Sequence, residues 1–356
     1  YLNLCGEIGT DPAEGVFTFG DYRTCGYADE VLEILDLAEY KHLLPPLIDG
    51  TRHHGRLTRD AAAATGLREG TPVVLAPVDF LCTGLGAGIY DKTRDLGCTI
   101  VGSTGIHLIL YHGLEEIEPK NQVGYTMPFC VPGTWAGLMS NMAAALNIDW
   151  LLNCAQQLVG SCGSTDMSRK ELLGLLDRKA GEAPPGTLIY HPFIFEAGER
   201  GPFVEPRARA QVLGLTTQTT LFDLMRAIYE GLGFAARDCY GGLSQQPPEV
   251  RLTGGAARSL VCRRILASIL GVPVRVSRRE ETGAAGAAVV AAACLGHYPG
   301  VAEACPAWVD ACLDANPQLP DPELAPLYDR LFEVYRLGYR QSFEFWCALD
   351  SLRRGS

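Results

Sequence analysis

Apolar and polar positions along the chain follow two periods, one typical of strands and one typical of helices. Runs of apolar and β-branched residues predict strands at 71–78, 96–111 (two strands bent around the letters GSTG), 123–140, 188–195, 249–254 and 272–277. Apolar residues at three- and four-residue steps predict helices at 28–40, 56–67, 141–158, 166–180, 220–243, 280–296 and 324–349, the last as one helix or a pair. Because strands and helices alternate, the predicted fold class is α/β.

One stretch, TPVVLAPVDFLCTGLGAG (71–88), places a single carboxylate after an apolar run. The run is apolar on both faces, so it predicts a buried strand that ends at Asp79. Small residues follow at Thr83, Gly84, Gly86 and Gly88. An aspartate at such a position often caps the next turn. The alternative is an acid with a chemical role at the end of a strand.

Three glycine-containing turns follow strands or open helices: GSTG (102–105), GGAARS (254–259) and TGAAGAA (282–288). Such turns expose backbone N–H groups that can hold a phosphate or admit an adenosine, although small residues after a strand more often serve tight packing. None is a Walker motif, and none is a G-x-G-x-x-G motif in a dinucleotide-fold setting.

The stretch GERGPFVEPRARAQVLGL (198–215) is rich in charges, carried by Glu199, Arg200, Glu205, Arg207 and Arg209. A charged run of this kind is usually a solvated loop. Its two prolines and three glycines instead indicate a loop of fixed shape.

A few other residues are predicted to have structural roles or to be solvated. We interpret His53 and His54 as solvated, and His107 and His191 as core histidines because their surroundings are apolar. Trp150 is predicted to be a core residue.

Composition narrows the partners. The net charge of −11 argues against a nucleic acid or an anionic membrane surface, since binding to phosphate backbones needs a basic face. No apolar run is long enough to span a membrane. The thirteen cysteines are odd in number, irregularly spaced and without a C-x-x-C pair, which predicts reduced thiols in a cytoplasmic protein.

The order of these motifs resembles the FGGY carbohydrate kinases, the xylulokinase-like branch of the actin-like sugar kinases. Asp79 falls where that family has its catalytic aspartate. VGSTG (101–105) resembles the phosphate loop, with its two hydroxyl residues in swapped order. The stretch 198–215 with LMRAIYEGLGFAARD (224–238) resembles the C-terminal signature, TGGAARS the adenosine loop, and TGAAGAA the connecting helix.

The resemblance implies an actin-like (ribonuclease H-like) ATPase fold with two domains around a cleft. Residues 1–93 would be the C-terminal part of the first, sugar-binding domain, which is incomplete, and 94–356 the second, nucleotide-binding domain, with YDKTRD (90–95) as the crossing between them. The family opens with an Asp-x-Gly motif that this sequence lacks, so we expect the chain to be N-terminally truncated relative to the family.

The resemblance also implies roles for individual residues. Asp79 would be the general base and would contact both the substrate and the metal, and Phe80 would contact the substrate where the family commonly has Asn or Gln. Small residues beside Asp79 would leave room for sugar and phosphate. The nucleotide-binding residues implied are Gly102, Ser103, Thr104, Gly105, Gly254, Gly255, Ser259 and Gly283. The implied cofactors are ATP and Mg²⁺.

The function expected from the resemblance is transfer of the γ-phosphate of ATP to a hydroxyl of a small sugar, with a ketopentose of the xylulose or L-xylulose type first. The alternatives are an erythritol or other polyol kinase, and a non-catalytic actin-like nucleotide-binding protein. The expected partner is a small sugar or polyol. Members of the family are often dimers, so the resemblance also allows a homodimer.

Overall fold

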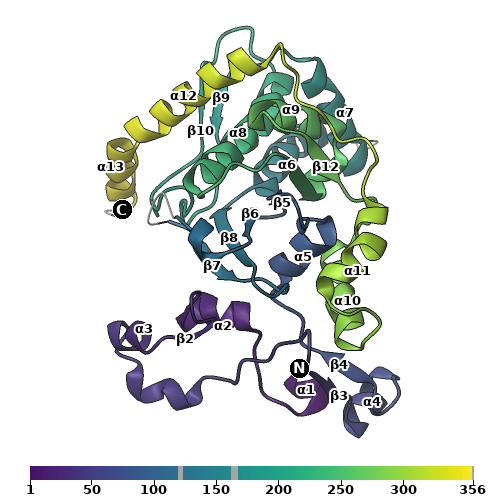
Figure 1. Ribbon diagram of the computed structural model, residues 1–356. Coiled ribbons are helices and arrows are strands. Elements are labelled where there is room, and N and C mark those ends of the chain that lie inside the picture. The colour runs from purple at the N-terminus through teal and green to yellow at the C-terminus, as the bar shows by residue number, and fades with distance from the viewer. Residues whose placement is uncertain (119–122, 162–166, 355–356) are drawn as a thin grey trace.

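A six-stranded sheet lies at the centre of the computed structural model, which describes residues 1–118, 123–161 and 167–354. The order across the sheet is β12–β11–β5–β6–β8–β7 (Figure 1). The strands are β5 (Gly97–Val101), β6 (Gly105–Tyr111), β7 (Tyr125–Pro128), β8 (Trp135–Asn141), β11 (Val250–Gly254) and β12 (Val274–Val276). β11 runs parallel to both β5 and β12, and the other pairs are antiparallel. The three parallel strands therefore end at the same edge of the sheet.

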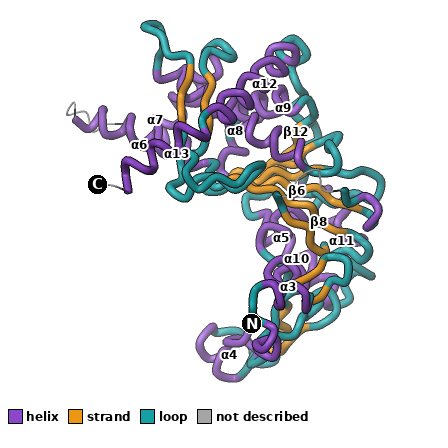
Figure 2. The backbone as a smooth tube through the Cα atoms, turned by 90° about the vertical axis from the view of Figure 1, so that its left-hand side faces the viewer, coloured by secondary structure: helices purple, strands orange, loops and turns teal. Residues whose placement is uncertain are grey.

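Helices cover both faces of this sheet, because its strands alternate their side chains between two cores. Ile109 and Tyr111 of β6 pack into one core, and Leu108 and Leu110 pack into the other. The first core is covered by α6 (Ala145–Ser161), α7 (Arg169–Glu182), α8 (Leu221–Gly242), α9 (Leu260–Leu270) and α12 (Ala325–Gln341). The second is covered by α5 (Asp79–Ala87), α10 (Thr282–Cys294) and α11 (Val301–Trp308). Figure 2 shows the two helical layers on opposite sides of the sheet.

Smaller elements complete this part of the chain. The hairpin β9 (Ile189–His191) and β10 (Gln211–Leu213) lies beside α8 and α12, and α13 (Phe343–Arg354) follows α12. Short 3-10 helices occur at η2 (Leu114–Glu116), η3 (Gly255–Arg258) and η4 (Asp310–Cys312).

Residues 1–78 form only short elements, which lie beyond α5 and α10 in Figure 1. They are α1 (Leu2–Cys5), α2 (Pro12–Phe19), β1 (Gly20–Asp21), β2 (Gly26–Tyr27), α3 (Asp29–Ile34), η1 (Ala38–Leu43), β3 (His54–Arg56), α4 (Arg59–Thr65) and β4 (Pro72–Val74). α2 contacts the large sheet through Ala13 and Val16, which belong to the second core. Several large apolar side chains of this segment, including Ile8, Ile34 and Leu43, are exposed.

Most predicted elements are confirmed. The two strands bent around GSTG are β5 and β6, and the helix predicted at 56–67 is α4, which Thr58 caps and Gly66 ends. The C-terminal pattern at 324–349 forms the pair α12 and α13. The predicted helix 28–40 is shorter, because α3 ends at Ile34 and a 3-10 helix follows.

The predicted buried strand at 71–78 is wrong. Only Pro72–Val74 is a strand, it pairs with β3, and it is partly exposed. Residues 75–78 are irregular, and Asp79 begins α5 rather than ending a strand. Two prolines within the run, Pro72 and Pro77, cannot donate ladder hydrogen bonds, which explains why the strand stays short.

Two further predictions concern burial. Trp150 is 39% exposed and is not a core residue. The charged stretch at 198–209 is not a solvated loop, because Glu199 and Glu205 are buried and bond to each other through both backbone N–H groups. The alternative prediction of a fixed loop shape is confirmed.

Candidate active site

Three of the predicted nucleotide elements meet at the edge where β5, β11 and β12 end. The GSTG turn leaves β5, the GGAARS turn leaves β11, and the segment after β12 enters α10. In α/β sheets the carboxyl ends of parallel strands are the usual location of ligands. The candidate site is therefore built on adjacent strands.

The GSTG turn is held from behind by α6. The N–H groups of Ala144 and Ala145 donate to the carbonyls of Ser103 and Gly102, at 2.8 and 2.9 Å. Within the turn, the N–H of Gly102 donates to the carbonyl of Thr104 at 3.1 Å. Ser103 at the tip is exposed, while Gly105 is buried as the first residue of β6. The side of the turn that faces residues 144–145 is therefore fixed by hydrogen bonds, and its tip at Ser103 is open to solvent.

The second turn approaches the first so closely that it requires glycine. Gly254 has φ +93°, and a Cβ placed there would lie 2.4 Å from the carbonyl oxygen of Val101, directly before the GSTG turn. Gly255 has open space around it. A side chain at 254 would push the two turns apart.

Ser259 lies at the end of this turn, where it caps α9. Its hydroxyl accepts from the N–H of Cys262 at 2.9 Å and donates to Asp177 Oδ1 at 2.5 Å. The hydroxyl of Tyr229 donates to the same carboxylate oxygen at 2.8 Å. The Ser259 hydroxyl therefore holds α9 against α7, and only its backbone faces the turn.

A cavity of about 490 Å³ opens at the ends of β11 and β12. Thr253, Gly254 and Gly255 line one side, and the segment 276–281 lines the other. The remaining lining side chains include Arg258 and Arg263. The cavity is large enough for part of a nucleotide, and its lining carries both signs of charge, with Arg258 beside Glu280 and Arg263 beside Asp314.

Asp79 is the first residue of α5, and its side chain is exposed. Among the described residues its carboxylate makes no hydrogen bond or ion pair. One turn further on, Thr83 donates to the Asp79 carbonyl at 2.8 Å and lies next to Gly283, where an added Cβ would be 3.0 Å from Thr83 Oγ1. Thr83 therefore contacts both the backbone of Asp79 and Gly283.

The expectation that the small residues of α5 leave room for a ligand is not met. These residues instead allow α5 to pack closely against α10. A Cβ on Gly86 would lie 1.9 Å from the carbonyl oxygen of Thr282, and a Cβ on Gly286 would lie 1.9 Å from that of Cys82. The backbones of α5 and α10 therefore touch where they cross. Gly84 is also buried, facing Leu108.

Contacts connect Asp79 to the glycine turns in a few steps. Thr83 meets the start of α10 at Gly283, and the neighbouring Thr282 shares a buried hydrogen bond of 2.9 Å with Thr253. Thr253 precedes Gly254, which pairs with Val101 beside the GSTG turn. The acid and both turns thus belong to one connected edge of the molecule. Phe80, next to Asp79, is partly buried against the second core.

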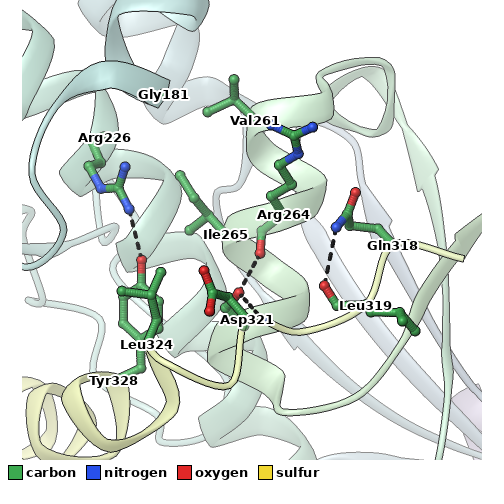
Figure 3. Close-up of a pocket in the computed structure, with 11 residues that line it drawn as sticks. Gly181, Arg226, Val261, Arg264, Ile265, Gln318, Leu319, Asp321, Leu324 and Tyr328 are labelled. Carbon is green, nitrogen blue, oxygen red and sulfur yellow. Dashed lines mark hydrogen bonds between the residues drawn. The ribbon is translucent and has the colours of Figure 1, made fainter.

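A second cavity, of about 460 Å³, lies between α7, α8, α9 and the segment 318–328 (Figure 3). In it, Arg226 points toward Tyr328 and donates to its hydroxyl at 3.1 Å. Arg226 also pairs with Glu230 at 2.9 Å, so its charge is satisfied internally. None of the predicted site residues lines this cavity, and we place no ligand in it.

Other candidate ligands are structural. His107 is buried between Thr99 and Asn141, and burial lowers its pKa to about 4; His191 is also buried, with its Nε2 2.8 Å from the Tyr335 carbonyl oxygen. His53 is exposed and pairs with Glu7. The described part of the chain contains no group of three or more His, Cys, Asp or Glu side chains placed to hold a metal, and its twelve cysteines are all free.

Sequence reasoning did not predict the burial of several acids, of which Asp11 and Glu199 are two. Asp11 caps α2 through the N–H groups of Ala13 and Glu14, and burial raises its pKa. Glu199 accepts from the backbone of Met142, and burial raises its pKa to about 7. A local signal existed for each: Asp-Pro is a common helix start, and the glycines and prolines around Glu199 indicated a fixed loop.

Comparison with known proteins identifies the class. Residues 98–295 match the FGGY family of carbohydrate kinases, C-terminal domain. The chain is 44% identical over 336 residues to the erythritol kinase of Brucella abortus, a match that covers 94% of this chain and 64% of that protein. It is 28% identical to the L-xylulose/3-keto-L-gulonate kinase of Escherichia coli, covering 90% of this chain and 59% of that protein. The chain belongs to the FGGY family of carbohydrate kinases.

Solved structures agree. The xylulose kinase of Rhodospirillum rubrum superposes with a TM-score of 0.76 at 26% identity, over 97% of this chain and 66% of that one. The predicted fold class, α/β with the actin-like ATPase fold, is therefore confirmed. The chain spans about two thirds or less of the length of these relatives. Of the helices in the described residues, none is both long and apolar enough to cross a membrane.

Proposed function

We propose that the chain carries the nucleotide-binding part and the general base of an ATP-dependent carbohydrate kinase. The observation that supports this proposal is the series of contacts that runs from Asp79 through Thr83, the start of α10 and Thr253 to the two glycine turns. Phosphoryl transfer requires the transferring group to be positioned and its charge neutralised, with an acceptor for the hydroxyl proton. The turns and Asp79 are suited to those roles.

In this proposal Asp79 accepts the proton of the substrate hydroxyl as that oxygen forms its bond to phosphorus. The turn Gly102–Gly105 holds the transferring phosphate through the backbone N–H groups of Ser103 and Thr104, since the N–H of Gly102 donates to the Thr104 carbonyl. Gly254 and Gly255 border the adenosine, with Ser259 and Gly283 at the edges of the nucleotide site. The body of α5 packs on the sheet of residues 94–354, so Asp79 lies at the junction of the two proposed domains, 1–93 and 94–356.

A magnesium ion fits this site. Mg²⁺ keeps several waters and usually takes only one or two protein carboxylates together with the phosphates of its nucleotide. The exposed carboxylate of Asp79 would supply one such protein ligand. When bound, the ion neutralises charge on the phosphate oxygens.

For the acceptor we propose a small polyol or ketose. Similarity to an erythritol kinase supports a four-carbon polyol, and similarity to xylulose-type kinases supports a ketopentose. Phe80 beside Asp79 would contact this acceptor. We also propose a cytoplasmic location, which the free cysteines favour, and a homodimer, which light scattering of the purified chain would test.

The test is a coupled assay of ADP release over tetritols, pentitols and ketopentoses. A kinase releases ADP in response to at least one of them, and this release disappears in Asp79→Asn. Nucleotide binding with no release on any acceptor would favour the alternative, a non-catalytic nucleotide-binding protein.

A further inference from the structure

Glu199 is a buried acid that the proposed mechanism does not use. Its side chain lies in the loop between β9 and β10, and the residue is 2% exposed. Its Oε1 accepts from the N–H groups of Met142 and Arg200, both at 2.8 Å, and from Gly201 at 3.5 Å. Hydrogen bonds to a carboxylate are shorter and stronger than neutral ones, so this oxygen is a firm anchor.

Met142 connects this anchor to the GSTG turn. It begins the short link between β8 and α6, and two and three residues later Ala144 and Ala145 donate to the carbonyls of the turn. The Glu199 carboxylate is therefore separated from the turn by three residues of backbone.

Asn141 provides a second tie between the same two segments. Its Nδ2 donates to the carbonyl of Gly201 at 2.6 Å, and its Oδ1 lies 2.9 Å from His107 Nε2. In the sheet, Asn141 is the register partner of Gly105. The loop at 199–201 thus holds residues 141 and 142, which lie directly behind the turn.

The second oxygen of Glu199, Oε2, is buried and has no hydrogen-bond partner in the described structure. An unpartnered buried carboxylate oxygen is costly, and a glutamine would fill nearly the same volume without a charge. An ionised acid at this position bonds the N–H of Met142 more strongly than a glutamine would.

We infer that Glu199 is a positioning residue for the GSTG turn: by fixing Met142 it sets where the turn presents its backbone N–H groups to a phosphate. This inference rests on the proposed function, because it assumes that the turn receives the phosphates of ATP. It assigns Glu199 no contact with the nucleotide.

The loop contains a matched control in Glu205. This residue is also buried, but its carboxylate bonds to Arg207, at 2.7 and 2.8 Å, and not to the link between β8 and α6. Replacing Glu205 disturbs the same loop without releasing Met142.

The experiment measures the affinities of the 356-residue chain for ATP and for adenosine by calorimetry, in wild type, Glu199→Gln and Glu205→Gln. Adenosine has no phosphates, so the ratio of the ATP affinity to the adenosine affinity reports the contribution of phosphate binding at the GSTG turn. We expect Glu199→Gln, assayed at pH 8.5 where the wild-type carboxyl is ionised, to weaken ATP binding about tenfold with adenosine binding changed less than twofold, because a neutral amide oxygen accepts from the Met142 N–H more weakly than a carboxylate does. Hydrogen exchange should also accelerate at Ala144 and Ala145 in this variant alone.

An unchanged ATP-to-adenosine ratio in Glu199→Gln would overturn the inference, and so would an equal change in Glu205→Gln. A merely structural role lowers both affinities together and leaves the ratio unmoved. If Glu199→Gln is unfolded at the assay temperature, Glu199→Asp takes its place and the same ratio decides. Failure of the wild-type chain to bind ATP would refute the proposed function itself, and is recognised separately.

Discussion

Residues 1–78 and residues 94–354 differ in how they are held together. The first segment buries few apolar side chains, namely Ala13, Val16, Ala28, Leu32, Leu57 and Ala61. The second part surrounds its sheet with two extensive cores. Asp79 lies where the two meet, on a helix whose body belongs to the second part. Because the Asp79 side chain is exposed, we expect its replacement to leave the free energy of unfolding nearly unchanged, whereas replacements at the buried helix crossing of the second part should lower it.

The largest effect is expected at Asp79. Asp79→Asn should lower turnover about 10²–10⁴-fold, because a neutral amide cannot accept the hydroxyl proton. The free energy of unfolding should change by less than about 0.5 kcal/mol, since the side chain is exposed. ADP-release kinetics and urea denaturation measure the two quantities. Asp60, an exposed aspartate in the first turn of α4, is the matched control, and Asp60→Asn should leave turnover unchanged.

The next effect concerns the crossing of α5 and α10. Gly86→Ala should lower the free energy of unfolding by about 3 kcal/mol, because its Cβ would lie 1.9 Å from the backbone oxygen of Thr282. Gly160→Ala in α6 is the control, with nothing within 4 Å of its Cβ, and it should stabilise by about 0.5–1 kcal/mol. Urea denaturation of both variants checks this. Equal stabilities would show that the helices are not in backbone contact.

A third effect depends on pH. Burial raises the pKa of Glu199 from 4.5 to about 7, so between these values the folded state binds a proton that the unfolded state has lost. The stability that this group contributes is present below pH 4.5 and is lost as the pH rises toward 7, a loss of about 3 kcal/mol. Glu199→Gln should remove this slope from the unfolding free energy. Glu205→Gln should keep it, because the pKa of Glu205 is lowered by Arg207.

The smallest effect is expected at Ser259. Ser259→Ala should cost about 1 kcal/mol, the usual value of a helix cap, through loss of its bond with the N–H of Cys262. The affinity for ATP should change less than threefold, because the hydroxyl bonds to Asp177 and Cys262. A tenfold loss of ATP affinity at unchanged stability would mean that this hydroxyl contacts the nucleotide.

Local sequence predicted the turns well. GSTG and GGAARS were found because a strand, a glycine turn and a helix each leave a pattern within a few residues. Their closeness could not be predicted, since the contact between Gly254 and Val101 joins strands far apart in the chain.

Errors arose where burial depends on distant partners. The run at 71–78 has the composition of a buried strand, but its strand pairs only with β3. Trp150 lies on a part of α6 that the described chain leaves open to solvent. Glu199 is buried because its carboxylate meets Met142, a partner 57 residues away.

The central claim is that Asp79 and the GSTG turn serve one reacting phosphate. A crystal structure of the chain with Mg²⁺ and a non-hydrolysable ATP analogue tests it most directly. We expect the terminal phosphate on the turn at 102–105, with a carboxylate oxygen of Asp79 about 6–7 Å from phosphorus, the distance that one intervening hydroxyl spans. A terminal phosphate in the cavity beside Arg226, or on the turn with Asp79 directed away from it, would refute the proposed roles of Asp79 and the turn.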